Sequence, residues 1–412
     1  MQVLYPCCAG LDVHKKLIVA CLRRMEASGQ VQIQVRSFGT MTGDLLALSD
    51  WLTGAGCTHV AMESTGVYWK PVYNILEGQL EILLVNAQHI KTVPGRKTDV
   101  KDAEWIAELL QHGLLKASFV PPRFQREWRD LTRYRTTLVR ERARIVERLQ
   151  KVLEDANIKL AGVATDVLGV SARQMLEALV EGCTDPQALA ELARGRLRKK
   201  IPQLQAALQG HFQSHHRFLI AEQLAHIDFL DEAITHLDQE IGQRLVPFEE
   251  ELQLLDTIPG IDRRIAEQLL AEIGPDMERF PDGGHLASWA GLCPGHHESA
   301  GKRRSGKTRK GSQWLRHTAI EAAHGAAHTQ QVYLSAQYHH LAGRKGKKKA
   351  LVAVAHSILV IAYYLLKRRQ AYSDLGANYL DERRKTILQH KLVHRLQKLG
   401  YKVTLEPAAV AA

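Results

Sequence analysis

The first 120 residues alternate between strand-like and helix-like stretches, and this alternation limits the folds open to the chain. Apolar runs rich in β-branched residues predict strands, whereas apolar residues at helical spacing predict helices. In order, these stretches are a strand around Asp12, strands at 17–22 and 31–38, a helix at 45–52, a strand at 59–63, a helix at 67–76, a strand at 82–85 and a helix at 99–115. The sequence therefore predicts an α/β domain.

The order of elements in this domain is three strands, a helix, a strand, a helix, a strand and a helix. This order resembles that of the ribonuclease-H-like fold of RuvC-type resolvases.

Four carboxylates are spread over this domain. Asp12 interrupts an apolar stretch near the middle of the first predicted strand, Glu63 ends the fourth, and Asp99 and Asp102 open the last helix. A carboxylate inside an apolar strand costs free energy unless a positive charge neutralises it. Mg²⁺ prefers hard oxygen ligands, and two such ions can stabilise both oxygens of a phosphoryl displacement. Together the four residues predict a site for divalent metal and phosphate.

The pair Asp99 and Asp102 also has a simpler explanation. Acidic residues in the first turn of a helix interact favourably with its dipole, and Thr98 or Asp99 could be the N-cap. The pair by itself is more typical of capping than of catalysis, and only the whole set favours a metal site.

Two long helices are predicted after Pro121 and Pro122. Their apolar residues recur at heptad spacing: Leu131, Leu138, Ile145 and Val152 in the first, and Ile220, Ile227, Leu230, Ile234, Leu237 and Ile241 in the second. These helices could pair with each other or with a second subunit, and the pattern leaves both open. Residues 160–210 between them indicate a small helical insertion.

A third region begins near Leu254 with a Pro-Gly turn between two helical patterns. Residues 255–261 and the apolar residues that follow resemble a helix-hairpin-helix, which offers backbone N–H groups to a phosphate. A purely structural turn is the alternative, because Pro-Gly turns between helices are common.

A basic, glycine-bearing loop follows, and it suits close approach to a phosphate backbone. Its basic residues are Lys302, Arg303, Arg304, Lys307, Arg309 and Lys310. Ser299, just before the loop, could attack phosphorus if its hydroxyl were activated, although a serine in such a loop is usually without a catalytic role. Ser305 is a weaker rival. A further basic cluster at 344–349 could line a phosphate groove or simply be solvated.

Composition agrees with a polyanionic partner but does not establish one. The 412 residues carry a formal net charge of +11, which favours nucleic acid. The six cysteines show neither zinc spacing nor the density of a disulfide framework, so we expect a reducing, intracellular location. The apolar segment 350–366 is slightly short for a membrane span and predicts a buried core helix.

The chain as a whole resembles the DEDD transposases of bacterial insertion sequences, which are relatives of the Piv-type DNA invertases. The resemblance rests on ordered blocks along nearly the full length. They are Gly10–Lys15, Met62–Trp69, Lys97–Ala103, Ile258–Gly260, Leu286–Leu292 and Pro294–Lys302, with Gly311, Leu315 and Arg316 following. One local difference is Ser312, where many relatives have asparagine.

The resemblance implies a fold, a site and partners. It implies a RuvC-like domain at 1–120, a helical coiled-coil region at 121–250 and a mostly helical transposase domain at 251–412. It assigns Mg²⁺ to Asp12, Glu63, Asp99 and Asp102, and it makes Ser299 a nucleophile that forms a covalent phosphoserine link to DNA.

The same resemblance implies double-stranded donor and target DNA, a structured guide (bridge) RNA, and dimers that assemble into tetramers with active sites shared between subunits. It implies no membrane partner and a bacterial cytoplasmic, nucleoid-associated location. Two alternatives stay open from the sequence. One is a RuvC-like Holliday-junction endonuclease that hydrolyses with metal, and the other is a nucleic-acid-binding scaffold without activity.

Overall fold

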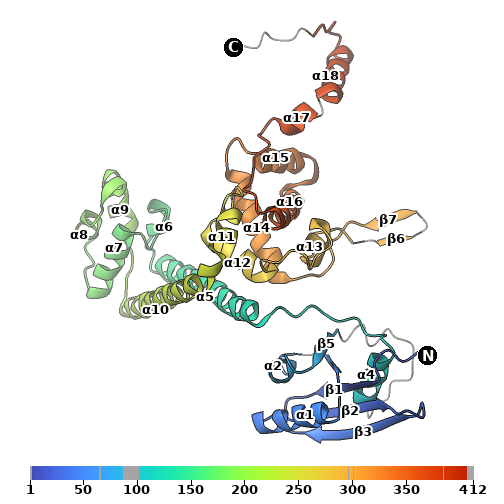
Figure 1. The fold of residues 1–412 in the computed structure, drawn as a ribbon. Helices are drawn as coiled ribbons and strands as arrows, with labels where there is room; N and C mark the ends of the chain where they lie inside the picture. Colours follow the sequence, from blue (N-terminus) through green and yellow to red (C-terminus); the bar gives the residue numbers. More distant parts are fainter. Residues whose placement is uncertain are drawn as a thin grey trace. The chain divides into compact units, whose positions relative to one another are not determined.

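The computed structural model describes residues 2–64, 66–86, 102–295, 297–299, 301–383 and 385–405. The chain divides into two compact units, residues 1–121 and 122–412. Each is described by itself (Figure 1).

The first unit is a mixed five-stranded sheet with helices on both faces. Its elements are β1 (Cys7–Val13), β2 (Ile18–Met25), β3 (Val31–Phe38), α1 (Thr42–Gly54), β4 (His59–Glu63), α2 (Trp69–Leu76), β5 (Glu81–Val85) and α4 (Asp102–Gln111). The strand order is β3-β2-β1-β4-β5, with β1, β2 and β3 antiparallel and β1, β4 and β5 parallel. The predicted order of elements is confirmed over the described residues and is consistent with a ribonuclease-H-like domain.

The alternation of side chains along the strands explains the two covered faces. Leu11 and Met62 belong to an apolar cluster with Leu48 of α1 and Leu76 of α2. Residues one step along the same strands point the other way, toward α4. Two small clusters form there, one around Cys8, Ala61, Ile106, Leu109 and Leu110, the other around Cys21, Ala103 and Ala107.

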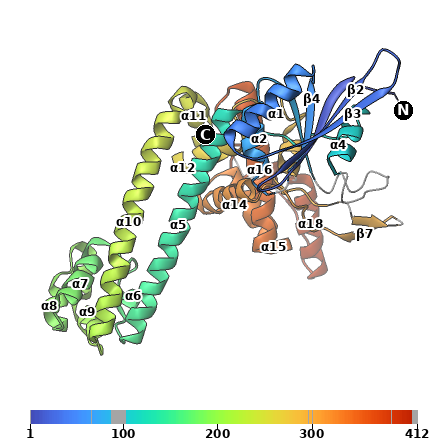
Figure 2. The ribbon, with the colours of Figure 1, turned by 90° about the horizontal axis from the view of Figure 1, so that it is seen from below.

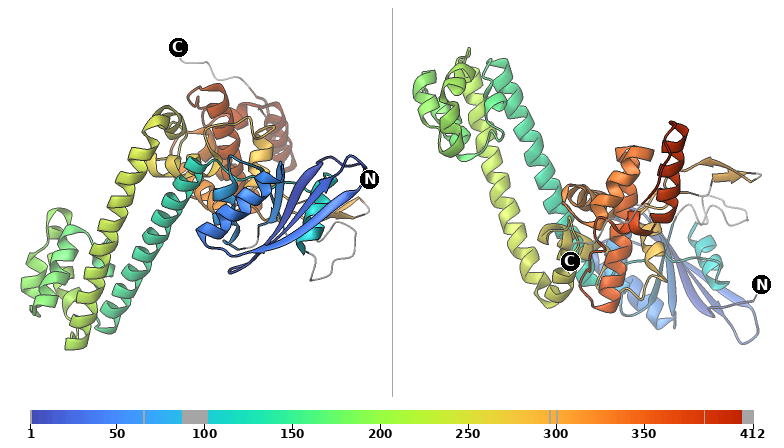
Figure 3. Two further views of the ribbon diagram at one scale, coloured as in Figure 1. Left: turned by 60° about the horizontal axis from the view of Figure 1, so that its bottom comes forward. Right: turned by 90° about the horizontal axis from the view of Figure 1, so that it is seen from above.

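The second unit starts with a long antiparallel helix pair, α5 (Arg123–Asp155) and α10 (Ser214–Leu245). Between them lie α6 (Leu160–Val163), α7 (Val170–Glu181), α8 (Pro186–Glu191), the 3₁₀ helix η1 (Gly195–Lys200) and α9 (Ile201–Leu208). These short helices sit at one end of the pair, as Figures 2 and 3 show.

The heptad residues pack within the chain. Leu138, Ile145, Ile220, Ile227, Leu230 and Ile234 are buried in one cluster with the inserted helices, and Ile241 is buried in the next. Of the two possibilities left open by the sequence, the structure shows pairing of the helices with each other. The heptad seam is therefore not free to bind a second subunit.

The rest of the unit is a helical domain. Its elements are η2 (Val246–Phe248), α11 (Glu249–Asp256), α12 (Arg263–Ile273), α13 (Gly283–Trp289), β6 (His297–Ser299), β7 (Lys302–Ser305), α14 (Gln313–His328), α15 (Tyr333–Lys345), α16 (Lys347–Arg368), α17 (Tyr379–Arg383) and α18 (Lys385–Lys398). Trp128 of α5 and Leu245 of α10 are buried in the core of this domain, so the helix pair joins two cores.

Helix α16 contains the apolar segment that raised the membrane question. It is the one helix among the described residues that is long and apolar enough to cross a membrane by length and composition. Val354, Ile358, Leu359 and Tyr363 are nevertheless buried among residues of α12, α13 and α14. The prediction of a buried core helix is thus confirmed in the structure.

Candidate active site and nucleic-acid groove

Two of the predicted metal ligands lie side by side at the carboxyl ends of parallel strands. Strands β1 and β4 pair in parallel up to Leu11 and Met62, so Asp12 and Glu63 are the next residues in this register. Asp12 is also paired with Val19, which packs in the cluster of Ala103 and Ala107. Because paired residues point to the same face, both carboxylates are on the face that α4 covers.

Helix α4 runs antiparallel to β1, and this brings Asp102 to the same end. The backbone N–H of Leu4 donates to Gln111 O at the end of the helix, and Cys8 Sγ donates to Ala107 O further along. At Gly10 a Cβ atom would lie 2.4 Å from Ala103 O, which only glycine permits. The helix therefore begins beside the carboxyl end of β1, where Asp12 is.

The structure thus gathers three of the four predicted ligands at one corner of the sheet, while Asp99 lies outside the described residues. One expectation was wrong in detail, because Asp12 is the second-to-last residue of β1 rather than near its middle. At a strand end a carboxylate keeps some contact with water, and 27% of the Asp12 side chain is exposed, with His14 Nε2 3.0 Å from its Oδ2. Carboxylates placed at one partly open corner are a suitable donor set for a divalent cation.

Ser299 ends the first strand of a short hairpin. Strands β6 and β7 are antiparallel, with Ser299 opposite Lys302 and a bulge between His297 and Glu298. Gly301, with φ +70°, lies in the connecting turn. The rival Ser305 is at the far end of β7, where its hydroxyl accepts a hydrogen bond from the backbone N–H of Lys307 at 3.1 Å.

The base of the hairpin is anchored tightly. The backbone N–H of Gly295 donates to Lys307 O at 2.9 Å, and Arg316 donates to Gly291 O and, at 2.9 Å, to Thr308 Oγ1. A Cβ atom on Gly311 would lie 2.4 Å from the backbone nitrogen of Gly291, so these two turns touch. Ser312 caps α14 by accepting from Leu315 N, which is the role that an asparagine would also fill.

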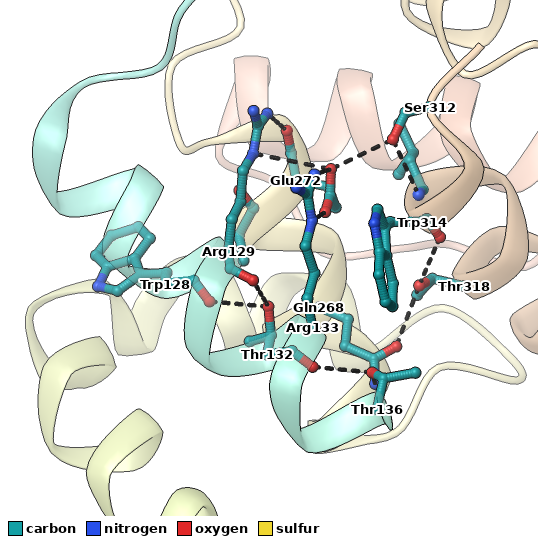
Figure 4. A network of polar contacts seen from close by, with 12 residues as sticks. Trp128, Arg129, Thr132, Arg133, Thr136, Gln268, Glu272, Ser312, Trp314 and Thr318 are labelled. Carbon is teal, nitrogen blue, oxygen red and sulfur yellow. Dashed lines mark hydrogen bonds and ion pairs between the residues drawn. The ribbon is translucent and has the colours of Figure 1, made fainter. Parts of the chain in front are cut away.

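A buried polar network connects this base to the long helix α5 (Figure 4). Glu272 of α12 is 3% exposed and accepts two hydrogen bonds from Arg133, at 2.7 and 3.0 Å. The Ser312 hydroxyl also donates to Glu272, at 3.4 Å. Arg129 donates to the backbone carbonyl of Glu272, and burial lowers the pKa of its guanidinium to about 10. Trp314 of α14 has Arg133 and Arg140 at 5.6 and 5.5 Å from its ring centroid.

The two basic clusters of the sequence meet in one groove. A cavity of about 1290 Å³ lies between the loop after β7 and helices α15 and α16. Its basic lining residues are Lys307, Arg316, Arg344, Lys345, Lys348 and Lys349, and no aspartate or glutamate of the described part of the chain lines it. We call this cavity the basic groove. Such a concentration of positive charge is suited to a phosphate backbone.

Lys302, Arg309 and Lys310 are exposed and do not line the groove, and Arg303 belongs to β7 opposite Glu298. Arg304, also in β7, completes the predicted set. The sequence predicts phosphate binding mainly in the 302–310 loop, and for the cluster at 344–349 it leaves a phosphate groove and a solvated charge run both open. The lining of the groove favours the first of these two for Lys345. Arg316 is an addition that only the fold reveals, because its helix packs beside the loop.

The helix-hairpin-helix expectation is only partly met. Helices α11 and α12 are joined by the Pro-Gly turn, in which Gly260 has φ +86°. A Cβ atom there would lie 2.3 Å from Ala322 O, so the turn is pressed against α14. Asp262 caps α12 by accepting from Ile265 N at 2.8 Å. A carboxylate at this position repels a phosphate, and the structure favours the structural-turn alternative.

Comparison with known proteins agrees with this arrangement. Residues 9–158 match a family model of DEDD type described as "Transposase", and residues 252–340 match one described as "Transposase IS116/IS110/IS902 family". The transposase for insertion sequence element IS1111A of Coxiella burnetii (strain RSA 493 / Nine Mile phase I) is 26% identical over 77% of this chain and 79% of its own length. The pilin gene-inverting protein of Moraxella bovis is 31% identical over 34% of this chain and 45% of its own length.

The first family model includes Asp12, Glu63 and Asp102, and the second includes Ser299 and the loop that follows it. The chain therefore belongs to the IS116/IS110/IS902 family of transposases and is a DNA transposase or recombinase.

Proposed function

We propose that the protein is the transposase of an insertion sequence and excises and inserts its element by cleaving and rejoining DNA. The observation that carries this proposal is the placement of Asp12, Glu63 and Asp102 at one corner between β1, β4 and α4. Together with Asp99 they would hold Mg²⁺, which when bound stabilises negative charge on phosphate oxygens. In this proposal 1–120 is the metal-binding domain, 121–250 a helical arm and 251–412 the domain that carries the serine.

Ser299 is the proposed nucleophile. Its hydroxyl oxygen forms a bond to phosphorus as the bond from phosphorus to the 3′-oxygen breaks, and the released strand end takes a proton to become a 3′-hydroxyl. Reversal of the same step joins a new 3′-hydroxyl and frees the serine. The position of Ser299 at the end of β6, opposite Lys302, supports this role because a lysine beside the phosphate favours the charge that develops.

The proposed partners are nucleic acids and further copies of the chain, and two surfaces of the second unit support them. The basic groove suits donor and target DNA and a structured guide (bridge) RNA, whose loops would select both DNA sites. Self-association into dimers and tetramers is supported by exposed aromatic residues on α10, since Phe218 and Phe229 are each 64% exposed. The cytoplasm, in association with the nucleoid, is the proposed location.

The nucleophile is tested by trapping the covalent intermediate. Purified protein, its element DNA and co-purifying RNA are incubated with Mg²⁺ and analysed for a protein–DNA adduct on a denaturing gel. We expect Ser299→Ala to abolish the adduct without weakening DNA binding, and Ser305→Ala to leave it intact. An adduct that persists in Ser299→Ala contradicts the assignment, and cleavage by that variant without any adduct indicates metal-dependent hydrolysis instead.

The metal site is tested by conservative replacement. Asp12→Asn keeps the size of the side chain but removes its charge, so we expect strand cleavage to fall by at least about 100-fold as metal-stabilised charge is lost. Asp50→Asn, an exposed residue of α1, is the matched control and should cleave normally. Equal activity of the two variants would argue against metal binding at Asp12. Sequencing the nucleic acid that co-purifies with the protein tests the guide RNA.

A further inference from the structure

The basic groove continues into an aromatic pocket along the same side of α16. A second cavity of about 500 Å³ shares His356 and Ser357 with the groove. Residues of α16 on either side of this shared pair line one cavity each. Lys345, which precedes α16, and Lys348, Lys349, Val352 and Ala353 line the groove, and Val360, Ile361, Tyr364, Leu365 and Arg368 line the pocket. One continuous valley between α15 and α16 is therefore basic at one end and aromatic at the other.

The aromatic end is built from side chains held in place by neighbours. Tyr372 donates its hydroxyl to Asp374 Oδ2 at 3.0 Å, and Tyr333 packs edge-to-face on Tyr379 with centroids 5.6 Å apart. Tyr364 is 39% exposed, and the Arg368 guanidinium carbon lies 4.9 Å from its ring centroid. Rigid rings lose little conformational entropy on binding and present flat faces to a planar ligand.

The junction between the two ends carries neutral polar groups. Gln337 of α15 donates to Ser357 Oγ at 3.0 Å, and its own Oε1 is buried with no hydrogen-bond partner among the described residues. Burial lowers the pKa of His356, so this imidazole is uncharged near neutral pH. Buried polar atoms without partners cost free energy, which a ligand with an N–H donor would recover.

We propose that this valley binds an unpaired stretch of nucleic acid, with its phosphates along the basic groove and one unstacked base in the pocket of Tyr333, Tyr364 and Tyr372. The proposal rests on the proposed function and narrows its substrate class from duplex to unpaired nucleotides. In a duplex the bases stack on one another and cannot reach such a pocket unless they are extruded. Basic grooves beside stacking aromatic rings are the usual means of binding single strands, whatever their sequence.

The test is an equilibrium measurement that needs no catalysis. Fluorescence anisotropy in EDTA compares the full-length protein bound to a labelled ten-nucleotide thymidine strand and to an abasic strand of the same length. Both strands carry the same phosphates, so their difference in affinity reports the bases alone. We expect wild-type protein to bind the thymidine strand about tenfold more tightly, the amount typical of one stacked base.

Three variants separate stacking from packing. Tyr364→Leu should lose the preference for the thymidine strand, whereas Tyr364→Phe keeps an aromatic face and should retain it. Tyr134→Leu replaces a tyrosine of α5 that is 56% exposed and far along the chain from the valley, and it should behave as wild type. Retention of the full preference in Tyr364→Leu would overturn the proposal, as would equal binding of both strands by wild type.

The outcome is distinguishable from a failure of the proposed function. Replacing Lys345 and Lys348 by glutamine should weaken both strands equally, because these residues meet phosphates rather than bases. If the lysine variant loses binding while Tyr364→Leu keeps the base preference, the basic groove binds nucleic acid as proposed but the aromatic pocket does not bind a base. The same strands made with ribose identify whether RNA or DNA is the better ligand, and a base preference on either one supports the proposal.

Discussion

Single residues of the N-terminal sheet determine how closely α4 can approach the strands. Gly10 leaves room for the helix backbone, and Cys8 and Cys21 fill the space on either side of it as small buried apolar groups. The position of Asp102 relative to Asp12 depends on this contact, because α4 runs along β1 and begins beside its carboxyl end. The close packing of small residues thus serves the candidate metal site directly.

Replacing Gly10 by alanine should displace α4. The added methyl group would lie 2.3 Å from Ala107 N, so we expect a loss of about 2 kcal/mol or more in the free energy of unfolding. Urea denaturation followed by circular dichroism measures it. Gly43→Ala is the control, because nothing lies within 4 Å of a Cβ atom at that position of α1. Equal stability of both variants would mean that α4 can move away at no cost.

The buried thiols predict a loss of stability at high pH. Burial raises the pKa of Cys8 and Cys57 to about 12 and that of Cys21 to about 11, against an ordinary value of 9.0. Between about pH 9 and 11 the folded state keeps protons that the unfolded chain releases, so stability falls as pH rises through this range. The urea midpoint measured at pH 8, 9.5 and 10.5 under reducing conditions should decrease.

The same urea midpoints, measured for Cys8→Ala at these pH values, test whether the buried thiols cause the decrease. This variant removes one buried thiol and should show a smaller decrease than wild type between pH 9 and 11. Cys183→Ala, in the second unit, serves as the comparison and should not alter the pH dependence of the first unit. An identical decrease in Cys8→Ala and wild type would contradict the assignment.

At the scale of elements, the second unit is held together by ion pairs across helices as well as by its core. Arg135 of α5 is 2% exposed and donates to Asp238 of α10 and Glu267 of α12, at 2.8 and 2.7 Å. The Glu272 network binds α5 to the start of α14 in a similar way. Because α14 follows the basic loop directly, these contacts position the hairpin of Ser299 relative to the long helix α5.

Glu272→Ala should destabilise the second unit and weaken strand cleavage. It leaves Arg133, which is 32% exposed, and the more buried Arg129 without the Glu272 carboxylate. We therefore expect a loss of about 2–4 kcal/mol, somewhat less than for a fully buried broken pair. Thermal unfolding and the adduct assay measure the two effects. Glu250→Ala, whose pair with Arg369 is 64% exposed on both sides, should cost about 0.5 kcal/mol or less. A similar cost for both would leave the network without a structural role.

At the scale of the whole molecule, part of the positive charge gathers at the basic groove. The net charge of +11 includes the six basic residues around the groove, a region without acidic lining residues among those described. A surface of this kind attracts nucleic acid at long range and releases counterions when it binds. The affinity should therefore depend steeply on salt.

Neutralising two groove lysines should reduce this salt dependence. For Lys345→Gln/Lys348→Gln, the slope of log affinity against log salt concentration should become shallower by about 1.4–1.8, since each phosphate contact contributes about 0.7–0.9. Lys151→Gln/Lys199→Gln is the matched control, with the same net charge of +9 (11 minus 2) but exposed positions outside the groove. Equal slopes for the two double variants would show that the groove makes no special contribution.

The elements that positioned the candidate site could be predicted from the sequence, because their signals are local. Alternation in 59–63 and helical spacing in 45–52 and 67–76 depend on neighbours two to four residues away. The heptads likewise predicted long helices, but not their partner, since one apolar seam can pack equally well within a chain or between chains. The assignments of the four acidic residues, Ser299 and the basic loop as site residues all stay predictions.

The sequence by itself determined the order of strands and helices, the acidic set and the family resemblance. Only the tertiary structure decided that Asp12 stands at a strand end beside Glu63, and that Arg316 and Lys345 share a groove with Lys307. The physical reason is that strand register and helix packing join residues separated by tens of positions. Such contacts depend on the shapes and volumes of many side chains at once, which no local pattern in the sequence records.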